Sequence, residues 1–400
     1  MPHLEADIGV VHGRIVEGLR IPFYKDVYFE TVFIPGFSDT HAHPQVIDAG
    51  LDTQEMFWRN SYEWLDEREL HIDEVMVRQD IGVSTRLAEL ALKRAVLEGV
   101  TMIAFTGVLE ANLKARLRFP TGPRLVLLPT LMDKKGWSTP QDVSRLYEKY
   151  KKYISDSLLR IGVFVHSLKW AGPKTFYGAI ELASKGRMPL GLHLSEGISE
   201  GDVFKSRIAV VNRPPRIVAV HCIDDDPASL GIRCSSCPAS NMLLYNRTRE
   251  SLKGVTSFGS DWPHLLGSVP RHLGLILKIF PGRLSEVIRR ITTGGYQDYG
   301  VSHTGDLVAY DAPLDRVLTG KPLPKLVMVA GSVVVEEGAI KETGETLRVI
   351  EKETLEVSKY VGEVYGDGTP PLVPGPQYVW DIVEGLGGEP RIHLARKTPV

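Results

Sequence analysis

The sequence predicts an α/β fold, a distorted (β/α)8 TIM barrel with a small flanking β-sandwich built from both chain ends. Between residues 36 and 300, apolar strand-like runs alternate with helical patterns, which is the order that a parallel barrel requires. Short alternating runs without a helical period stand at both ends of this region. The expected parts are sandwich (1–34), barrel (35–300), sandwich (301–350) and an extended tail (351–400).

The barrel strands are expected where apolar, often β-branched runs stand between helical patterns. The first strand ends near residue 43, and the others are runs 100–105, 124–128, 160–165, 190–194, 216–220, 231–235 and 255–258. Helical periods cover residues 84–98, 143–157, 175–184 and 284–292, and Gly99 closes the first of them. Little sequence separates the sixth and seventh strands, so that pair is the weakest part of the pattern.

The chain ends are expected to pair with each other in the flanking sandwich. Strand-like runs cover residues 8–11, 13–16 and 27–34 at the start, and 305–310 and 325–335 after the barrel. Residues 352–400 are mixed in character and rich in proline and glycine, which favours an extended, partly ordered tail.

Composition limits the kinds of partner. The chain has 400 residues, 43% hydrophobic and 24% charged, with a formal net charge of −2. This charge gives no general attraction to nucleic acid or to anionic membranes, and no apolar run approaches the ~20 residues of a membrane span. Three cysteines and the absence of a signal-peptide pattern favour a cytoplasmic protein. We expect a small-molecule substrate as partner and leave a homo-oligomer open.

The first strand ends in two histidines, His41 and His43, one residue apart. Side chains at i and i+2 of a strand point the same way, so both imidazoles leave the strand end together. Taken alone, this pair is better explained by two partly exposed histidines at a strand end than by a metal site.

Three later runs end in further ligand-type side chains. They are His193, followed by Glu196, then His221 and Asp261. In a parallel barrel the carboxyl ends of all strands lie on one face, where the active sites are found. A catalytic zinc takes about three protein ligands and keeps a position open. Four such strand ends together predict a metal site.

Five motifs carry a resemblance to a known family. In order they are PGFSDTHAH (35–43), HLSE (193–196), VHC (220–222), CPASN (237–241) and GSD (259–261). They resemble the amidohydrolase superfamily, in its cytosine-deaminase, guanine-deaminase and chlorohydrolase-like branch. The segments TTGGYQDYG (292–300) and GDLVAYD (305–311) look like the return of those enzymes into their sandwich. The resemblance covers most of residues 1–340.

The resemblance implies a role for each position. One Zn²⁺ or Fe²⁺ would be held by His41, His43, His193 and Asp261, with Asp261 also orienting the attacking water. Glu196 would shuttle protons, and His221 would polarise the attacked centre. A bound metal lowers the pKa of water from near 15.7 to about 7, and proton transfer by a placed side chain typically adds ~10²–10⁴-fold.

The implied reaction is hydrolysis at a C–N centre of a cyclic amidine or heteroaromatic ring, with release of ammonia. Two alternatives stay open: a binuclear cyclic amidohydrolase of the dihydroorotase type, and a non-catalytic ligand-binding relative. Lys169 bears on the first alternative, because in binuclear members a lysine at the fourth strand is carbamylated and bridges two metals.

Several residues have a functional and a structural interpretation. Gln45, His166, Asn241 and Trp262 are candidates for substrate contact, and an ordinary loop, turn or structural role is the alternative for each. The aromatic residues of the first loop are either a lid over a flat ring or a local core; they are Phe57, Trp58, Tyr62 and Trp64. Cys234 and Cys237 lack the second pair that a structural zinc site requires.

Overall fold

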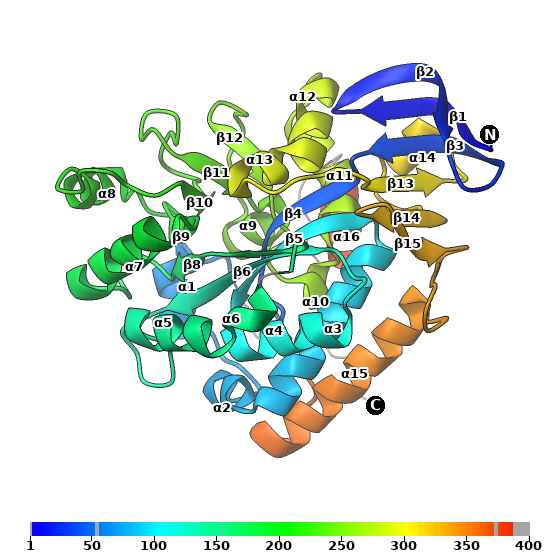
Figure 1. The fold of residues 1–400 in the computed structure, drawn as a ribbon. Helices are drawn as coiled ribbons and strands as arrows, with labels where there is room; N and C mark the ends of the chain where they lie inside the picture. Colours follow the sequence, from blue (N-terminus) through cyan, green and yellow to red (C-terminus); the bar gives the residue numbers. More distant parts are fainter. Residues whose placement is uncertain (1, 53–55, 155, 372–374, 387–400) are drawn as a thin grey trace.

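A computed structural model describes residues 2–52, 56–154, 156–371 and 375–386, and it contains two sheets (Figure 1). The larger sheet has the order β12-β11-β10-β9-β8-β6-β5-β4, with β7 also paired to β6. Its strand pairs are all parallel, and a parallel bridge between Ala42 and Asp261 joins the two edges. The predicted (β/α)8 barrel is therefore confirmed.

The barrel strands follow the predicted runs closely. They are β4 (Phe37–Ala42), β5 (Val100–Gly107), β6 (Arg124–Leu131), β7 (Leu159–Ile161), β8 (Val163–Val165), β9 (Leu190–Leu194), β10 (Ile217–His221), β11 (Arg233–Ser236) and β12 (Val255–Phe258). Most of their side chains are buried, as expected for parallel strands covered on both faces. β7 and β8 are the two halves of the predicted strand 160–165, separated at Gly162.

Helices follow most barrel strands. In the barrel region they are α1 (Ser61–Glu67), α2 (Glu74–Gln79), α3 (Ile81–Leu97), α4 (Leu109–Arg118), α5 (Pro140–Lys149), α6 (Lys151–Ile154), α7 (Pro173–Gly186), α8 (Gly201–Ile208), α9 (Pro238–Tyr245), α10 (Pro263–Leu266), η1 (Val269–His272), α11 (Leu273–Ile279), α12 (Leu284–Arg289), η2 (Arg290–Gly294) and α13 (Gly295–Tyr299). The predicted helix 143–157 is α5 with α6, and α5 begins with a capping box between Thr139 and Asp142. Gly99 follows α3 with a φ of +96°, which explains why the chain turns there.

The two chain ends pair in a second, seven-stranded sheet beside the barrel (Figure 1). Its strands are β1 (His3–Val11), β2 (Arg14–Pro22), β3 (Val27–Ile34), β13 (Leu307–Tyr310), β14 (Leu326–Val329), β15 (Ser332–Glu336) and β16 (Ala339–Ile340). β3 pairs antiparallel with β13, and this pairing joins the start of the chain to the segment after the barrel. The short helix α14 (Leu314–Val317) lies between β13 and β14.

The expectation of an extended segment 351–400 is wrong over much of its length. The 19-residue helix α15 (Leu347–Tyr365) packs along α3, and α16 (Gln377–Gly385) packs on α11. α15 buries Ile350, Thr354, Ser358 and Val361, which recur every three or four residues. Two of these four are polar, so hydrophobicity alone did not reveal the helix. Residues 387–400 lie outside the described part of the chain, and the limits set at 34, 300 and 350 stay a prediction.

None of the helices in the described ranges combines the length and the apolar character that a membrane span needs.

Candidate active site

The predicted ligand residues meet at the carboxyl end of the barrel. His41 lies near the end of β4, His193 lies in β9, and His221 is the last residue of β10. Backbone hydrogen bonds hold the β4 end against the segment after β12: the Asp261 N–H donates to the His41 carbonyl at 2.8 Å, and the His43 N–H donates to the Asp261 carbonyl at 2.6 Å. Closure of the barrel therefore brings the first and last motifs together.

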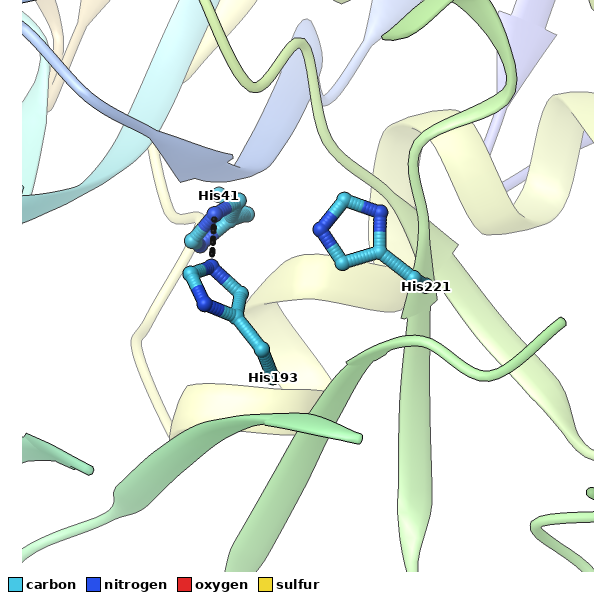
Figure 2. Close-up of side chains that lie close together, drawn as sticks. All are labelled: His41, His193 and His221. Atoms are coloured by element: carbon cyan, nitrogen blue, oxygen red, sulfur yellow. Dashed lines mark hydrogen bonds between the residues drawn. The ribbon is translucent and has the colours of Figure 1, made fainter. Parts of the chain in front are cut away.

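Three imidazoles converge through their Nε2 atoms. The Nε2 of His41 is 2.9 Å from that of His43 and 3.1 Å from that of His193, and the remaining Nε2–Nε2 distance is 3.4 Å. The Asp261 Oδ1 lies 3.5 Å from the His41 Nε2 and 3.4 Å from the His43 Nε2. Figure 2 shows His41, His193 and His221 facing a common point from three strands.

This donor set fits a divalent metal ion. Burial lowers the pKa of His43 and of His193 well below the usual value, and the neighbouring imidazoles add to the effect. Both rings therefore stay neutral and keep a lone pair for a metal, which is the form that a ligand needs. Two groups of three residues could hold an ion: His41, His193 and His221, and His41, His43 and Asp261. Within each group, all ligand atoms lie within 4.8 Å of one another. Three imidazoles and one carboxylate are a typical donor set for zinc.

Neighbouring side chains orient two of these rings. The Thr106 hydroxyl is 3.0 Å from the His43 Nδ1. The Asn241 Oδ1 is 2.8 Å from the His221 Nδ1, and the Asn241 amide donates to the Thr248 hydroxyl at 3.1 Å. Partners of this kind fix the tautomer of a metal-site histidine and turn its other nitrogen toward the site.

The two carboxyl groups of the site have opposite environments. Burial, helped by the charge of Asp261, raises the pKa of Glu196 well above its usual value. Burial also raises the pKa of Asp261, but the hydrogen bond from His41 and the nearby His221 and His43 outweigh it and hold this pKa below its usual value. One group therefore tends to carry a proton and the other to be ionised, which is the pattern of an acid–base pair.

Backbone strain is concentrated at these strand ends. Ser195, His221, Cys222 and Asp261 all have positive φ angles, between 50° and 71°, although none is a glycine. Such conformations cost of order 1–3 kcal/mol each and persist where the surrounding structure imposes them. Two of these four residues, His221 and Asp261, belong to the site, so part of the strain lies at residues with a predicted role in the chemistry.

A narrow cavity of about 40 Å³ lies over this group. We call its lining residues from strand ends the strand wall: His43, His193, Glu196, His221 and Asp261. We call the lining residues from the later part of the connection between β4 and α3 the loop wall: Trp64, Leu65, Arg68, Glu74 and Arg78. Val46, Trp137, His166 and Trp262 complete the lining.

Two of the four residues expected near the substrate line the cavity. These are His166, whose ring centroid is 5.2 Å from that of His193, and Trp262, which packs on Trp64. Gln45 is buried outside the lining and donates to the Asn112 side chain at 2.7 Å. Asn241 also lies outside the lining, where it holds His221.

The aromatic residues of the first loop do not act as one group. Trp64 lines the cavity, and its indole N–H donates to the Ala49 carbonyl at 3.0 Å. The Tyr62 hydroxyl donates to Glu200, Trp58 packs on a neighbouring apolar cluster, and Phe57 is exposed. Within the described residues, the cavity lining includes only Trp64 from this set.

Lys169 and the cysteines lie apart from the cavity lining. The Lys169 Nζ is 3.0 Å from the Asp66 carboxylate, and its side chain is 38% exposed. Cys222, Cys234 and Cys237 are buried free thiols, and none belongs to a metal-capable cluster in the described part of the chain.

The sequence did not reveal the charged residues of the loop wall. Arg68, Glu74 and Arg78 lie in a stretch without a motif or a strand pattern. The i, i+4 spacing of Glu74 and Arg78 on α2 was the only local signal, and it is common on exposed helices. Tyr245, whose hydroxyl donates to the Glu196 Oε1 at 2.7 Å, was also missed.

Known proteins with related sequences are deaminases. No family model matches the chain. It is 28% identical over 267 residues to a 5-methylthioadenosine/S-adenosylhomocysteine deaminase of Thermodesulfovibrio yellowstonii, a match that covers 60% of this chain and 58% of the relative. It is 25% identical over 232 residues to the enzyme of the same name from Lawsonia intracellularis, covering 53% and 50%. The matches thus span about half of the length of these relatives.

Solved structures with the same fold are hydrolases. An adenosine deaminase from Xanthomonas campestris, solved with zinc, aligns with a TM-score of 0.67 at 16% identity, over 90% of this chain and 98% of that one. Zinc-bound atrazine chlorohydrolase from Arthrobacter aurescens aligns at 0.66 and 13% identity, over 89% and 100%. An amidohydrolase from Brucella melitensis aligns at 0.64 and 17% identity, with the same coverage. The resemblance inferred from the motifs is confirmed to this extent: the chain is similar in sequence to two deaminases, and it shares the fold of solved amidohydrolase, deaminase and chlorohydrolase structures.

Proposed function

We propose that this protein is a metal-dependent hydrolase that removes an amino group from a cyclic amidine or heteroaromatic ring. The single observation that carries the proposal is the meeting of three imidazole Nε2 atoms within 3.4 Å beside two carboxyl groups with opposite pKa shifts. The names of the sequence relatives support an amino-substituted purine nucleoside as the first substrate to try.

One divalent ion, Zn²⁺ or Fe²⁺, would be held by His41, His43, His193 and Asp261. Such an ion supplies a water nucleophile that is active near neutral pH. Asp261 is ionised and lies among the imidazoles, so it orients the attacking water and accepts its proton.

Glu196 is placed to move protons on the substrate. Its raised pKa keeps a proton available, and the hydrogen bond from Tyr245 fixes one carboxyl oxygen. We propose that Glu196 protonates a ring nitrogen next to the attacked carbon and later delivers a proton to the departing amino group. Acid–base catalysis of this kind typically contributes ~10²–10⁴-fold.

His221 presents its Nε2 between the two carboxyl groups, 3.6 Å from the Glu196 Oε1 and 4.0 Å from the Asp261 Oδ2. Burial lowers its pKa to about 4, so the ring is neutral. With the Nδ1 proton shared with Asn241, the Nε2 faces the site as an acceptor. An acceptor nitrogen can hold the attacking water by accepting a hydrogen bond from it. To polarise the attacked centre, as the resemblance implies, His221 would need a proton on Nε2, so this geometry favours the first role.

The environment of Lys169 favours one metal over two. A bridging carbamate would need the lysine Nζ beside the metal ligands, whereas Lys169 pairs with Asp66 and is partly exposed. A single ion with Glu196 as proton shuttle is therefore the proposal, ahead of the binuclear alternative. A cytoplasmic location and a homo-oligomeric state stay predictions.

The test is ammonia release by protein loaded with zinc or ferrous iron. The panel comprises adenosine, 5′-methylthioadenosine, aminopyrimidines, pterins and aminotriazines. We expect turnover of at least one ring and its loss on chelation. Opening of cyclic amides without ammonia release from any ring would replace the proposal by the cyclic amidohydrolase alternative.

A further inference from the structure

We propose that the loop wall contains a second recognition site, in which Arg68 and Arg78 bind an anionic substituent of the substrate, a carboxylate or a phosphate. Both arginines line the same cavity as the predicted metal ligands. One part of this proposal rests on the proposed function: the anionic group is taken to belong to the molecule that is deaminated.

Glu74 bridges the two arginines. Its Oε2 accepts from the Arg68 Nη2 at 2.5 Å, and its Oε1 accepts from the Arg78 Nε at 3.0 Å. The three side chains are largely buried, with 11%, 7% and 23% exposed for Arg68, Arg78 and Glu74. Both carboxylate oxygens are thus engaged, and Glu74 is a counter-ion with little capacity left to bind substrate.

The charges of this group do not cancel. Two guanidinium groups face one carboxylate, and neither arginine forms an ion pair with any other acidic side chain in the described part of the chain. Burial raises the pKa of Glu74, but Arg68 and Arg78 outweigh it and hold the pKa at about 2, so Glu74 contributes a full negative charge. Within the described ranges, one positive charge therefore has no carboxylate partner at a place where water access is limited, which is costly unless an anion completes the group.

An indole ring lies close to each guanidinium group. The Arg78 Cζ lies 4.0 Å from the ring centroid of Trp137, and the Arg68 Cζ lies 4.5 Å from that of Trp64. Among the described residues, no hydrogen bond uses the Arg68 Nε and Nη1 or either Nη of Arg78. A fixed guanidinium with free N–H groups matches the paired oxygens of a carboxylate or phosphate.

A purely structural role explains this arrangement less well. A single arginine would be enough to neutralise the charge of Glu74 and to hold the loop through an ion pair. A second buried guanidinium group adds a positive charge without a partner among these three side chains. Both arginines also lie on the cavity side of the loop with Trp64, whereas the loop's Arg59 is 84% exposed and pairs with Glu63. The loop therefore contains two kinds of arginine, and only the buried kind faces the cavity.

The experiment offers an accepted ring with and without an anionic group, for example adenosine, adenosine 5′-monophosphate and adenosine-5′-carboxylic acid. The wild type should prefer the anionic members in kcat/KM by ~10-fold or more, the effect of one charge-assisted hydrogen bond. In Arg78→Gln and Arg68→Gln the kcat/KM for the anionic substrates should fall by ~10-fold or more relative to the kcat/KM for adenosine in the same variant, and this relative loss should lie in KM. Arg59→Gln, the matched control, should keep the preference.

The proposal would be overturned if the arginine variants lost kcat/KM equally for neutral and anionic substrates. It would also be overturned if the wild type preferred the neutral ring. If no ring is deaminated, the proposed function fails, but the arginine site is still tested by calorimetry with pyrophosphate. Binding that Arg78→Gln abolishes and Arg59→Gln retains supports the site, and absence of binding to the wild type refutes it. A further test needs no variant: calorimetry compares the affinity of the wild type for inosine with its affinity for inosine 5′-monophosphate. Tighter binding of inosine would also contradict the site.

Discussion

The strand wall and the loop wall of the cavity are built by different means. The strand wall is held by the barrel, whose closure through Asp261 and the β4 end fixes the imidazoles to within a few ångströms. The loop wall is held by ion pairs and by guanidinium–indole contacts within one long connection. The contrast suggests that the two walls have different roles: the strand ends carry the catalytic groups, and the loop determines which substrate binds.

Removing a predicted metal ligand should have the largest effect. His41→Ala should lower turnover by ~10³-fold or more, because it removes part of a group that holds several kcal/mol of transition-state stabilisation. Bound zinc, measured by elemental analysis after gel filtration, should fall in parallel. His303→Ala, which lies beside His12 away from the cavity, is the control and should keep both. Full metal content in His41→Ala would remove His41 from the ligand set.

Glu196→Gln should separate chemistry from metal binding. Gln has nearly the same shape but cannot transfer a proton, so turnover should fall ~10²-fold or more. Metal content and thermal stability should stay close to those of the wild type, since the metal rests on other residues. Rates of ammonia release comparable to the wild type would show that another group shuttles the proton.

Glu74→Gln tests the loop wall through stability. The change leaves two buried guanidinium groups facing each other, so we expect a loss of about 2–3 kcal/mol in the free energy of unfolding. This is below the ~3–5 kcal/mol of a fully buried pair, since Arg68 and Glu74 keep some water contact. Urea unfolding measures it. Glu63→Gln, which breaks the ion pair with the exposed Arg59, should change the free energy of unfolding much less. Equal effects of the two changes would mean that the loop wall is an ordinary surface.

Asn241→Ala should have the smallest effect on turnover. The change removes the partner of the His221 ring but no residue of the cavity lining. Loss of a partner of this kind typically lowers activity by ~10-fold or more. We expect a fall in kcat, with KM nearly unchanged. Thr248→Ala removes the neighbour of Asn241 but leaves the contact to His221, so it should act more weakly. A larger effect of Thr248→Ala would assign Asn241 to the loop structure instead.

The strand wall was predictable from sequence, and the loop wall was not. His43, His193, His221 and Asp261 follow apolar runs, and strand ends in a parallel barrel must meet. Arg68 and Arg78 follow no such rule, because their positions depend on Trp64 and Trp137.

Partners that lie far apart in sequence explain the remaining differences. Gln45 points to Asn112 and Asn241 to His221, contacts over 67 and 20 residues that no local pattern encodes. The helix α15 escaped prediction because its buried face is half polar.

The most direct test of the central claim is the metal content of the wild-type protein, purified without chelator. We expect about one equivalent of zinc or iron per chain, and chelation should remove both the metal and all ammonia release. Two tightly bound equivalents, or full activity in metal-free protein, would contradict it.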